Sequence, residues 1–143
     1  STIHSFVRPL TAAGCCMNDR VKAWIDKADG DFEVAEQELT AASRPNYDAV
    51  CYHCQQCIEK LLKGALIGRG VDPPYVHDIA YLTKLLRESG FTLHAEEREL
   101  RLLSQSAVVF RYPGENATVE DAKEVMAICT RLRDALKNLL QER

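Results

Sequence analysis

The sequence predicts an all-α protein, an up-and-down antiparallel helical bundle of about five helices. Apolar residues recur at intervals of three and four in five stretches, which is the period of an amphipathic helix. Short breaks that contain proline, glycine or small polar residues separate these stretches, and no segment alternates as a strand does. At 143 residues, 46% of them hydrophobic, the chain is long enough to form one domain with its own core.

The charge balance restricts the ligands that the protein can bind. A formal net charge of -3 argues against a generally basic nucleic-acid-binding surface, so any nucleotide or RNA contact must rest on a local patch. No run approaches the ~18 apolar residues of a membrane span, and the first residues lack the pattern of a signal peptide. We therefore expect a cytoplasmic protein without membrane contact, and we expect no cofactor.

The first sixteen residues carry no periodic pattern, whereas a clear helix follows them. Met17 is followed at once by Asn18 and Asp19, which are both good N-cap residues. We interpret residues 1–16 as a disordered or appended N-terminal lead, with the natural chain beginning at Met17. Residues 17–143 are then the helical bundle domain.

The first helix is expected from about Asp19 to Ala42. Its acidic side chains, Asp31 among them, lie off a narrow apolar stripe and are typical of a solvated surface. The break that follows it, Ala-Ser-Arg-Pro-Asn, is short. We therefore expect this helix and the next to fold back on each other as an antiparallel hairpin.

The rest of the bundle is expected to pack around a second helix, from Tyr47 to Gly70. Asn46 favours its start, and Gly70 favours its end. One face is an apolar stripe that other helices must cover, formed by Tyr47, Val50, Cys51, Cys54, Cys57, Ile58, Leu61, Leu62 and Ala65. The opposite face carries more hydrogen-bonding groups than a solvated surface needs: Tyr52, Gln56, Glu59, Lys60 and Lys63, with His53 and Gln55 at its edges.

Three of the six cysteines, Cys51, Cys54 and Cys57, lie on the apolar stripe of the second helix. In a chain without a secretory signal, this placement favours reduced thiols that are buried as small hydrophobic side chains. The alternative is a metal or iron–sulfur site through the same three cysteines. Such a site needs a loop that turns its thiolates inward and a fourth ligand. The helical spacing favours the core, and we expect no metal site.

Three further helices complete the prediction. A loop with two adjacent prolines precedes a short third helix that starts after Asp78 or His77 as a cap and stops near Gly90. A fourth helix spans roughly residues 95–110 and breaks at Pro-Gly. Thr118-Val-Glu-Asp121 is a variant capping box that starts the fifth helix.

Three segments of the chain form a specific combination. The second helix reads Tyr-His-Cys-Gln-Gln-Cys-Ile-Glu-Lys-Leu-Leu-Lys-Gly-Ala-Leu, the next loop Pro-Pro-Tyr-Val-His-Asp, and the end of the fourth helix Phe-Arg-Tyr-Pro-Gly. With these segments the chain resembles the HEPN family over about Asn18 to Leu140. The resemblance implies a helical bundle that commonly dimerises and binds nucleotides. It also implies a minimal nucleotidyltransferase as the partner in a toxin–antitoxin-like pair.

Many HEPN proteins are metal-independent ribonucleases, in which an arginine is followed after four to six residues by a histidine. The histidine moves protons at the RNA 2′-hydroxyl, and the arginine stabilises developing phosphate charge. Arg111 matches the arginine, but positions 116 to 118 are asparagine, alanine and threonine, so the histidine is missing. Arg111 and His77 remain the candidate catalytic residues, with His53 as another base.

The candidate nucleotide-binding residues combine phosphate-binding cations with groups that stack on or hydrogen-bond to a base. They are Tyr52, Gln56, Lys60, Lys63, Arg111 and Tyr112. The two lysines, Arg111 and Tyr112 have a structural interpretation as well. The lysines are equally typical of a surface supported by neighbouring glutamates, and an arginine and tyrosine at a helix end can satisfy carbonyls and pack a ring. His77 is favoured as a loop or cap residue.

Three functions from different classes follow. The leading one is a HEPN module that binds a nucleotide or RNA and acts with a nucleotidyltransferase partner. The second is a ribonuclease with a degenerate motif, in which Arg111 stabilises phosphate and His77 or His53 is the base. The third is a purely structural dimerisation or interaction domain, whose polar helix face makes the interface.

Overall fold

The computed structural model describes residues 13–141, with side chains from residue 18 onward, and this part of the chain contains helices and no strand. The five helices are α1 Ala13–Leu39, α2 Tyr47–Gly68, α3 Ile79–Glu88, α4 Glu97–Val109 and α5 Val119–Gln141. The all-α prediction is confirmed. None of these helices is long and apolar enough to cross a membrane.

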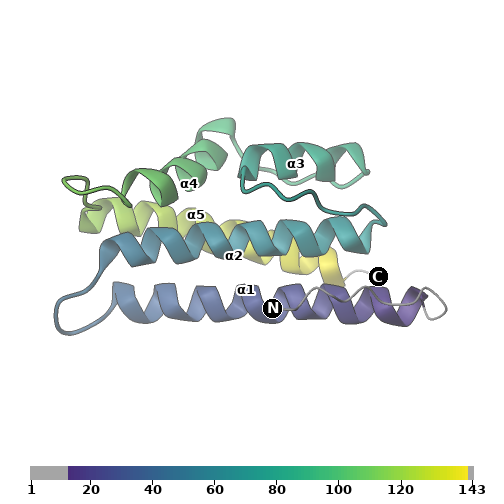
Figure 1. The fold of residues 1–143 in the computed structure, drawn as a ribbon, viewed down its shortest axis with the longest axis horizontal. Coiled ribbons are helices and arrows are strands. Elements are labelled where there is room, and N and C mark those ends of the chain that lie inside the picture. Colours follow the sequence, from purple (N-terminus) through teal and green to yellow (C-terminus); the bar gives the residue numbers. More distant parts are fainter. Residues whose placement is uncertain (1–12, 142–143) are drawn as a thin grey trace.

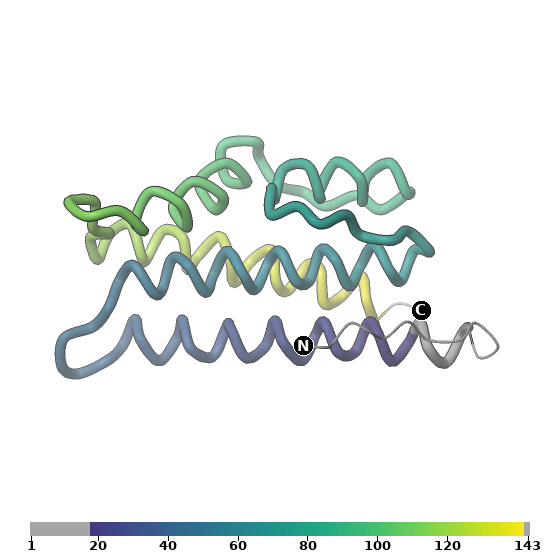
Figure 2. Tube along the Cα trace, viewed as in Figure 1, coloured from purple at the N-terminus to yellow at the C-terminus, as the bar shows by residue number. Residues whose placement is uncertain are grey.

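Helix α2 is the centre of the bundle and contacts each of the other four helices. Figure 1 shows α1 antiparallel to α2 on one side, α3 and α4 on the other, and α5 behind α2. The tube in Figure 2 shows that α1 and α2 run side by side for most of their length. This arrangement buries both faces of α2, the apolar stripe and much of the polar face.

The ends of α2 form for the reasons that the sequence indicates. The side chain of Asn46 accepts a hydrogen bond from the amide of Ala49 at 3.0 Å, which caps the first turn. Gly70 follows the helix with φ of +80°, a conformation that favours glycine. Inside the helix, Gly64 lets α1 approach closely, because a Cβ there would lie 3.1 Å from the Cβ of Trp24.

The thiols of α2 belong to the core, as predicted. Cys51, Cys54 and Cys57 are fully buried. The Sγ of Cys54 lies 3.6 Å from the sulfur of Met126, and Cys129 of α5 lies 3.7 Å from the carbonyl of Cys54. Burial raises the pKa of Cys51 to about 12, with the charges of Asp121 and Asp48 adding to the effect. Small, uncharged thiols therefore fill the α2–α5 contact.

Two helix starts follow the predicted capping residues. Asp78, and not His77, caps α3, because its carboxylate accepts from the amides of Ala80 and Tyr81. At α5, Thr118 and Asp121 exchange two hydrogen bonds between side chain and backbone, of 2.9 and 3.0 Å. This is the geometry of a capping box with Asp in place of Glu.

Helix α1 differs from its expected range. It begins at Ala13 and ends at Leu39, whereas the sequence pattern predicted about Asp19 to Ala42. The hydrophobic period could not locate the start, because residues 13–16 are small or polar and show no amphipathic stripe. The interpretation of residues 1–16 as a lead falls mostly on residues 1–12, which lie outside the described part, and it stays a prediction.

Candidate functional site

Two buried carboxylates, one from α1 and one from α2, lie at the polar face of α2. The first, Asp31, comes from α1 and is only 9% exposed. It accepts a hydrogen bond from the ammonium of Lys60 at 2.5 Å and pairs with Nδ1 of His53 at 2.7 Å. Because α1 and α2 pack closely, one carboxylate of α1 holds two basic side chains of α2.

The second carboxylate, Glu59, precedes Lys60 on α2 and is even less exposed, at 5%. Its Oε1 accepts from the amide of Gln55 at 3.0 Å. Its Oε2 accepts from the ammonium of Lys63 at 3.0 Å and lies 2.9 Å from Nδ1 of His77. All the polar atoms of this buried carboxylate therefore have partners, as buried charges require.

Glu59 is ionised because its partners outweigh its burial. Burial alone would raise the pKa of the carboxyl. Hydrogen bonds from His77, Gln55 and Lys63, together with the charge of Lys63, reverse that effect and lower the pKa below its ordinary value. The site thus keeps a negative charge beneath a histidine.

His77 is the most accessible member of the cluster. Its side chain is 81% exposed, although its Nδ1 is fixed by the buried Glu59. Its main-chain carbonyl also accepts a hydrogen bond from Gln55 at 3.1 Å. Gln55 and Glu59 of α2 therefore both bind the loop before α3 at this residue. With Nδ1 occupied, Nε2 is the ring nitrogen left for a ligand or a proton.

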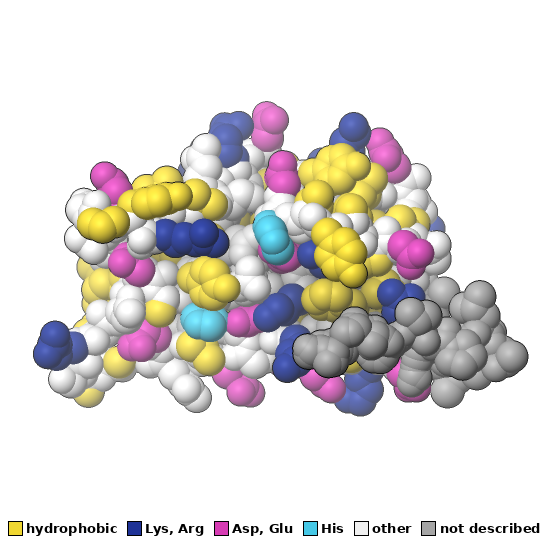
Figure 3. Space-filling model, viewed as in Figure 1, with side chains coloured by type: hydrophobic (Ala, Val, Ile, Leu, Met, Phe, Trp, Pro, Cys, Tyr) yellow, Lys and Arg dark blue, Asp and Glu magenta, His cyan; other side chains and the backbone are white. Residues whose placement is uncertain are grey.

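The two clusters make one mixed surface. Figure 3 shows histidine side chains, in cyan, among basic and acidic ones over the middle of α2 and below α3 and α4. Within each cluster, the carboxylate is matched by one lysine, and the histidine adds positive charge only when it is protonated. The surface can therefore offer hydrogen-bond donors to an anion without a large fixed charge.

Comparison with known proteins identifies the family of the chain. The family model of the HEPN domain matches residues 21–139, which cover all of α2–α4 and most of α1 and α5. The chain belongs to the HEPN domain family.

A relative and two solved structures extend the comparison. The chain is 27% identical over 142 residues to a Methanocaldococcus jannaschii protein named "Putative toxin MJ1304", covering 85% of this chain and 89% of that protein. The crystal structure of TT1696 from Thermus thermophilus superposes with a TM-score of 0.66 and 19% identity, covering 84% of this chain and 98% of that one. The crystal structure of ST0689, described as an archaeal HEPN homologue, superposes with a TM-score of 0.63 and 24% identity, covering 85% of this chain and 98% of that one. The two structures share the HEPN helical fold.

The structure places the predicted site residues of this HEPN chain in two groups. Four of them lie on α2: Lys60 and Lys63 belong to the two clusters, and Tyr52 and Gln56 lie beside them. Tyr52 is partly exposed and contacts the ring of His53 edge-on, with centroids 5.2 Å apart, and Gln56 donates to Gln55 at 2.8 Å.

Lys63 is less accessible than the sequence suggested. The sequence pattern predicted that the ammonium of Lys63 faces a ligand. In the structure Lys63 is only 6% exposed, and its ammonium donates to Glu59. Trp24 of α1 covers it, with the ring centroid 5.9 Å from Nζ. Lys60 keeps 24% of its side chain exposed, so it is the lysine of the pair that a ligand can reach.

Arg111 and Tyr112 lie in the turn after α4, and both are exposed. Their backbone amides bond to the carbonyls of Val108 and Val109, at 3.2 and 3.3 Å. Among the described residues, the Arg111 guanidinium has no hydrogen-bond or ion-pair partner. The turn therefore presents a guanidinium and a phenol to solvent, and no direct bond joins Arg111 to His77 or His53.

Sequence reasoning missed Asp31 and the role of Gln55. Asp31 was assigned to a solvated face, yet it is buried and holds two basic residues. Its position three residues after Ala28 and four before Ala35, both fully buried, places it beside the apolar stripe of α1. That spacing was the available signal. Gln55 gave none, because its partner His77 is 22 residues away.

Proposed function

We propose that this HEPN chain binds a nucleotide or RNA on the exposed edge of the polar face of α2. In this proposal it works as a homodimer in the cytoplasm, with a nucleotidyltransferase-domain protein as its partner in a toxin–antitoxin-like pair. The observation that carries the proposal is the row of His53, Lys60 and His77, each oriented by a buried carboxylate. The HEPN domain and the relative named as a toxin fit such a role.

The chemistry of this row suits a phosphate group. An ammonium has three donors, and one contact within the chain accounts for only part of that capacity at Lys60. Each histidine has Nδ1 directed to a carboxylate, so Nε2 is the donor or acceptor available to a ligand. Tyr52 adds a partly exposed ring beside His53, on which a base can stack.

Arg111 and Tyr112 supply a second set of contacts in the proposal. The Arg111 guanidinium is exposed and without a partner in the described residues, so a phosphate would not have to displace an existing ion pair. A guanidinium binds phosphate in a bidentate geometry, and a phenol ring stacks on bases. Lys63 has a different role here, because it neutralises Glu59 and supports the surface from below.

The proposal is tested by equilibrium binding of labelled single-stranded RNA, ATP and GTP at fixed salt. We expect Lys60→Ala and Arg111→Ala each to weaken the affinity of a bound ligand about five-fold or more, which corresponds to about 1 kcal/mol. Lys123→Ala on α5 removes an exposed lysine outside the site and should leave the affinity unchanged. Failure of all three ligands to bind folded protein would reject the proposal.

Two further measurements test the assembly. Light scattering after size-exclusion chromatography gives the mass of the particle, and a monomer at all concentrations would reject the homodimer. Purification of the tagged chain from its native host, followed by mass spectrometry, tests the partner, with a co-purified nucleotidyltransferase-domain protein as the expected result. If the chain binds RNA but forms neither the homodimer nor the complex with a nucleotidyltransferase-domain protein, only the RNA-binding part of the proposal is supported.

One observation favours a second function, metal-independent RNA cleavage. A carboxylate on Nδ1 of an exposed histidine fixes the tautomer and orientation that general-base catalysis needs. Glu59 and His77 have this geometry, which offers a substitute for the histidine that is missing after Arg111. Cleavage that persists in EDTA, and that His77→Asn abolishes even when RNA is added at a concentration that saturates the variant, would establish this function.

A further inference from the structure

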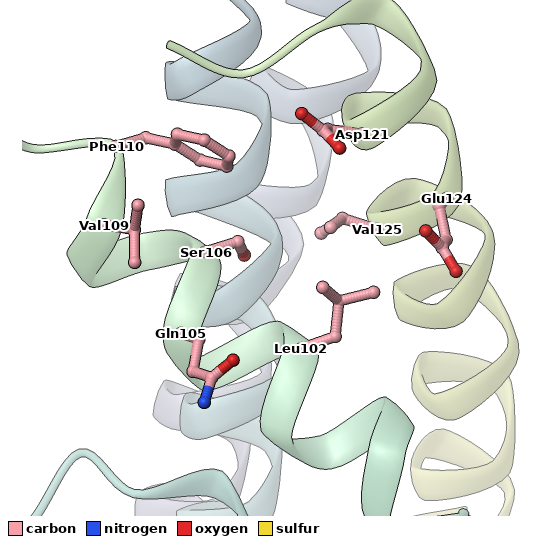
Figure 4. Close-up of a pocket in the computed structure, with 8 residues that line it drawn as sticks. All are labelled: Leu102, Gln105, Ser106, Val109, Phe110, Asp121, Glu124 and Val125. Atoms are coloured by element: carbon pink, nitrogen blue, oxygen red, sulfur yellow. The ribbon is translucent and has the colours of Figure 1, made fainter. Parts of the chain in front are cut away.

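A pocket lies between α4 and α5, away from the polar face of α2. It has a volume of about 150 Å³. Figure 4 shows Leu102 and Ser106 from α4 and Val125 from α5 directed toward the space, with Val109 and Phe110 at one end. A cavity of about this volume accommodates a benzene ring, so the pocket fits one leucine or phenylalanine side chain.

The α5 side of the pocket is acidic. Asp121 and Glu124 line it, and their carboxylates stand on α5, opposite the apolar residues of α4. Asp121 accepts from the amide of Thr118, and Glu124 pairs with Arg98 at 3.3 Å through a half-exposed side chain. Solvent-accessible carboxylates beside an apolar pocket favour a group that is apolar in its centre and positively charged at its edge.

The end of α4 beside the pocket carries two exposed valines. Val108 is 50% exposed, and Val109, which lines the pocket, is 40% exposed. A small molecule of pocket size would leave Val108 uncovered, whereas a protein segment can fill the pocket and cover this valine at the same time.

We infer that the α4–α5 pocket is the docking site for a segment of a partner protein that places one leucine- or phenylalanine-sized side chain beside lysine or arginine. A second copy of the chain docked through this patch would bring the Asp121 and Glu124 carboxylates of both copies together across the two-fold axis, and like charges oppose that contact. The inference does not rest on the nucleotide site, since no residue is shared with it.

The test titrates three pentapeptides, each with both termini blocked, into the full chain. Two-dimensional ¹H–¹⁵N NMR of the chain measures their binding. Gly-Lys-Phe-Lys-Gly carries the anchor and the cations, Gly-Lys-Ala-Lys-Gly lacks the anchor, and Gly-Glu-Phe-Glu-Gly reverses the charge. We expect the first peptide to shift the amides of Leu102, Ser106 and Val125 saturably. The other two peptides should bind at least five-fold more weakly.

Variants assign the effect to the pocket. Leu102→Phe fills the space, and Glu124→Gln removes a carboxylate; each should weaken the first peptide at least three-fold. Glu120→Gln, an exposed glutamate on α5 outside the pocket lining, is the matched control and should bind like the wild type. The NMR spectra themselves show whether each variant is folded.

Three results would overturn the inference: no saturable shift with the first peptide, equal binding of the acidic peptide, or shifts confined to other surfaces. Dimerisation that Leu102→Phe abolishes, measured by light scattering, would also overturn it, because the pocket would then hold a second copy. None of these results tests RNA binding on α2, so this inference can fail while the proposed RNA site stands, and the reverse also holds.

Discussion

Lys63 and Glu59 form a buried ion pair one turn apart on the central helix, with 3.0 Å between Nζ and Oε2. Their side chains are 8% and 6% exposed. Burying two charges costs free energy unless their remaining hydrogen-bond capacity is satisfied. Here Gln55 and His77 complete the bonds of Glu59, so one face of α2 is part of the interior although it is polar.

Glu59→Gln should destabilise the protein strongly. The substitution removes the counter-charge of Lys63 and leaves a buried ammonium, which typically costs about 3–5 kcal/mol. The double variant Glu59→Gln/Lys63→Met removes both charges and should recover a large part of that loss. Urea unfolding followed by circular dichroism measures the free energies. A loss below about 1 kcal/mol in the single variant would mean that the pair contributes little.

The approach of α1 to α2 at Gly64 predicts a contrast between two glycines. Alanine is favoured over glycine inside a helix by about 1 kcal/mol. Gly30 of α1 has nothing within 4 Å of an added Cβ, so Gly30→Ala should gain up to that amount. At Gly64 the added methyl would lie 3.1 Å from the Cβ of Trp24, which the backbone holds in place.

We expect Gly64→Ala to be less stable than Gly30→Ala by at least about 1 kcal/mol, because α1 must move to admit the methyl. Thermal unfolding of the two variants and the wild type gives the comparison. An equal gain at both positions would show that the helices separate at no cost.

The fold was predictable because its signals are local. The stripe from Val50 to Ala65 gave the central helix, and capping residues such as Asn46 and Asp78 gave helix starts within a residue or two. The predicted start of α1 was wrong because residues 13–16 carry neither an apolar stripe nor a capping residue, so no local signal marks it. The HEPN resemblance, read from three short segments, is confirmed by the family match over residues 21–139.

The candidate site was predictable only in part, because its geometry depends on distant pairs. The sequence shows that Lys60 and Lys63 share a face, but both are lysines one turn apart and look alike. Lys63 lies against Trp24 of α1 and is paired with the buried Glu59, whereas Lys60 keeps 24% of its side chain exposed. Contacts between residues so far apart in the chain leave no periodic trace in a sequence.

The buried thiols should resist alkylation in the folded protein. Cys51, Cys54, Cys57 and Cys129 are fully buried, and a reagent needs access to a thiolate. The pKa of Cys57 is raised by its hydrogen bond with Cys129 and by burial, so thiolate is scarce as well. Iodoacetamide at pH 8 followed by mass spectrometry should leave these four unmodified until urea is added. Rapid labelling of Cys57 in native buffer would contradict the packing.

Asp29 should make the stability depend on pH in acid. Burial opposes its ionisation, but hydrogen bonds from Lys137 and Arg133, at 3.0 and 3.1 Å, outweigh burial and lower its pKa in the folded state. A group whose folded pKa is lowered stabilises the protein above its unfolded pKa. That contribution is lost as the pH falls from about 4 through the folded pKa.

Asp29→Asn removes the charge at every pH. At pH 7 it should lower the free energy of unfolding by about 1–3 kcal/mol, because two charge-assisted hydrogen bonds are weakened. The difference from the wild type should shrink as the pH falls below about 4, where the wild-type carboxylate is itself protonated. Urea unfolding at pH 7, 5 and 3 measures this difference, with Asp26→Asn as the control, because Asp26 forms only an exposed pair with Lys22. A difference that stays constant between pH 7 and 3 would show that the ionisation of Asp29 does not contribute.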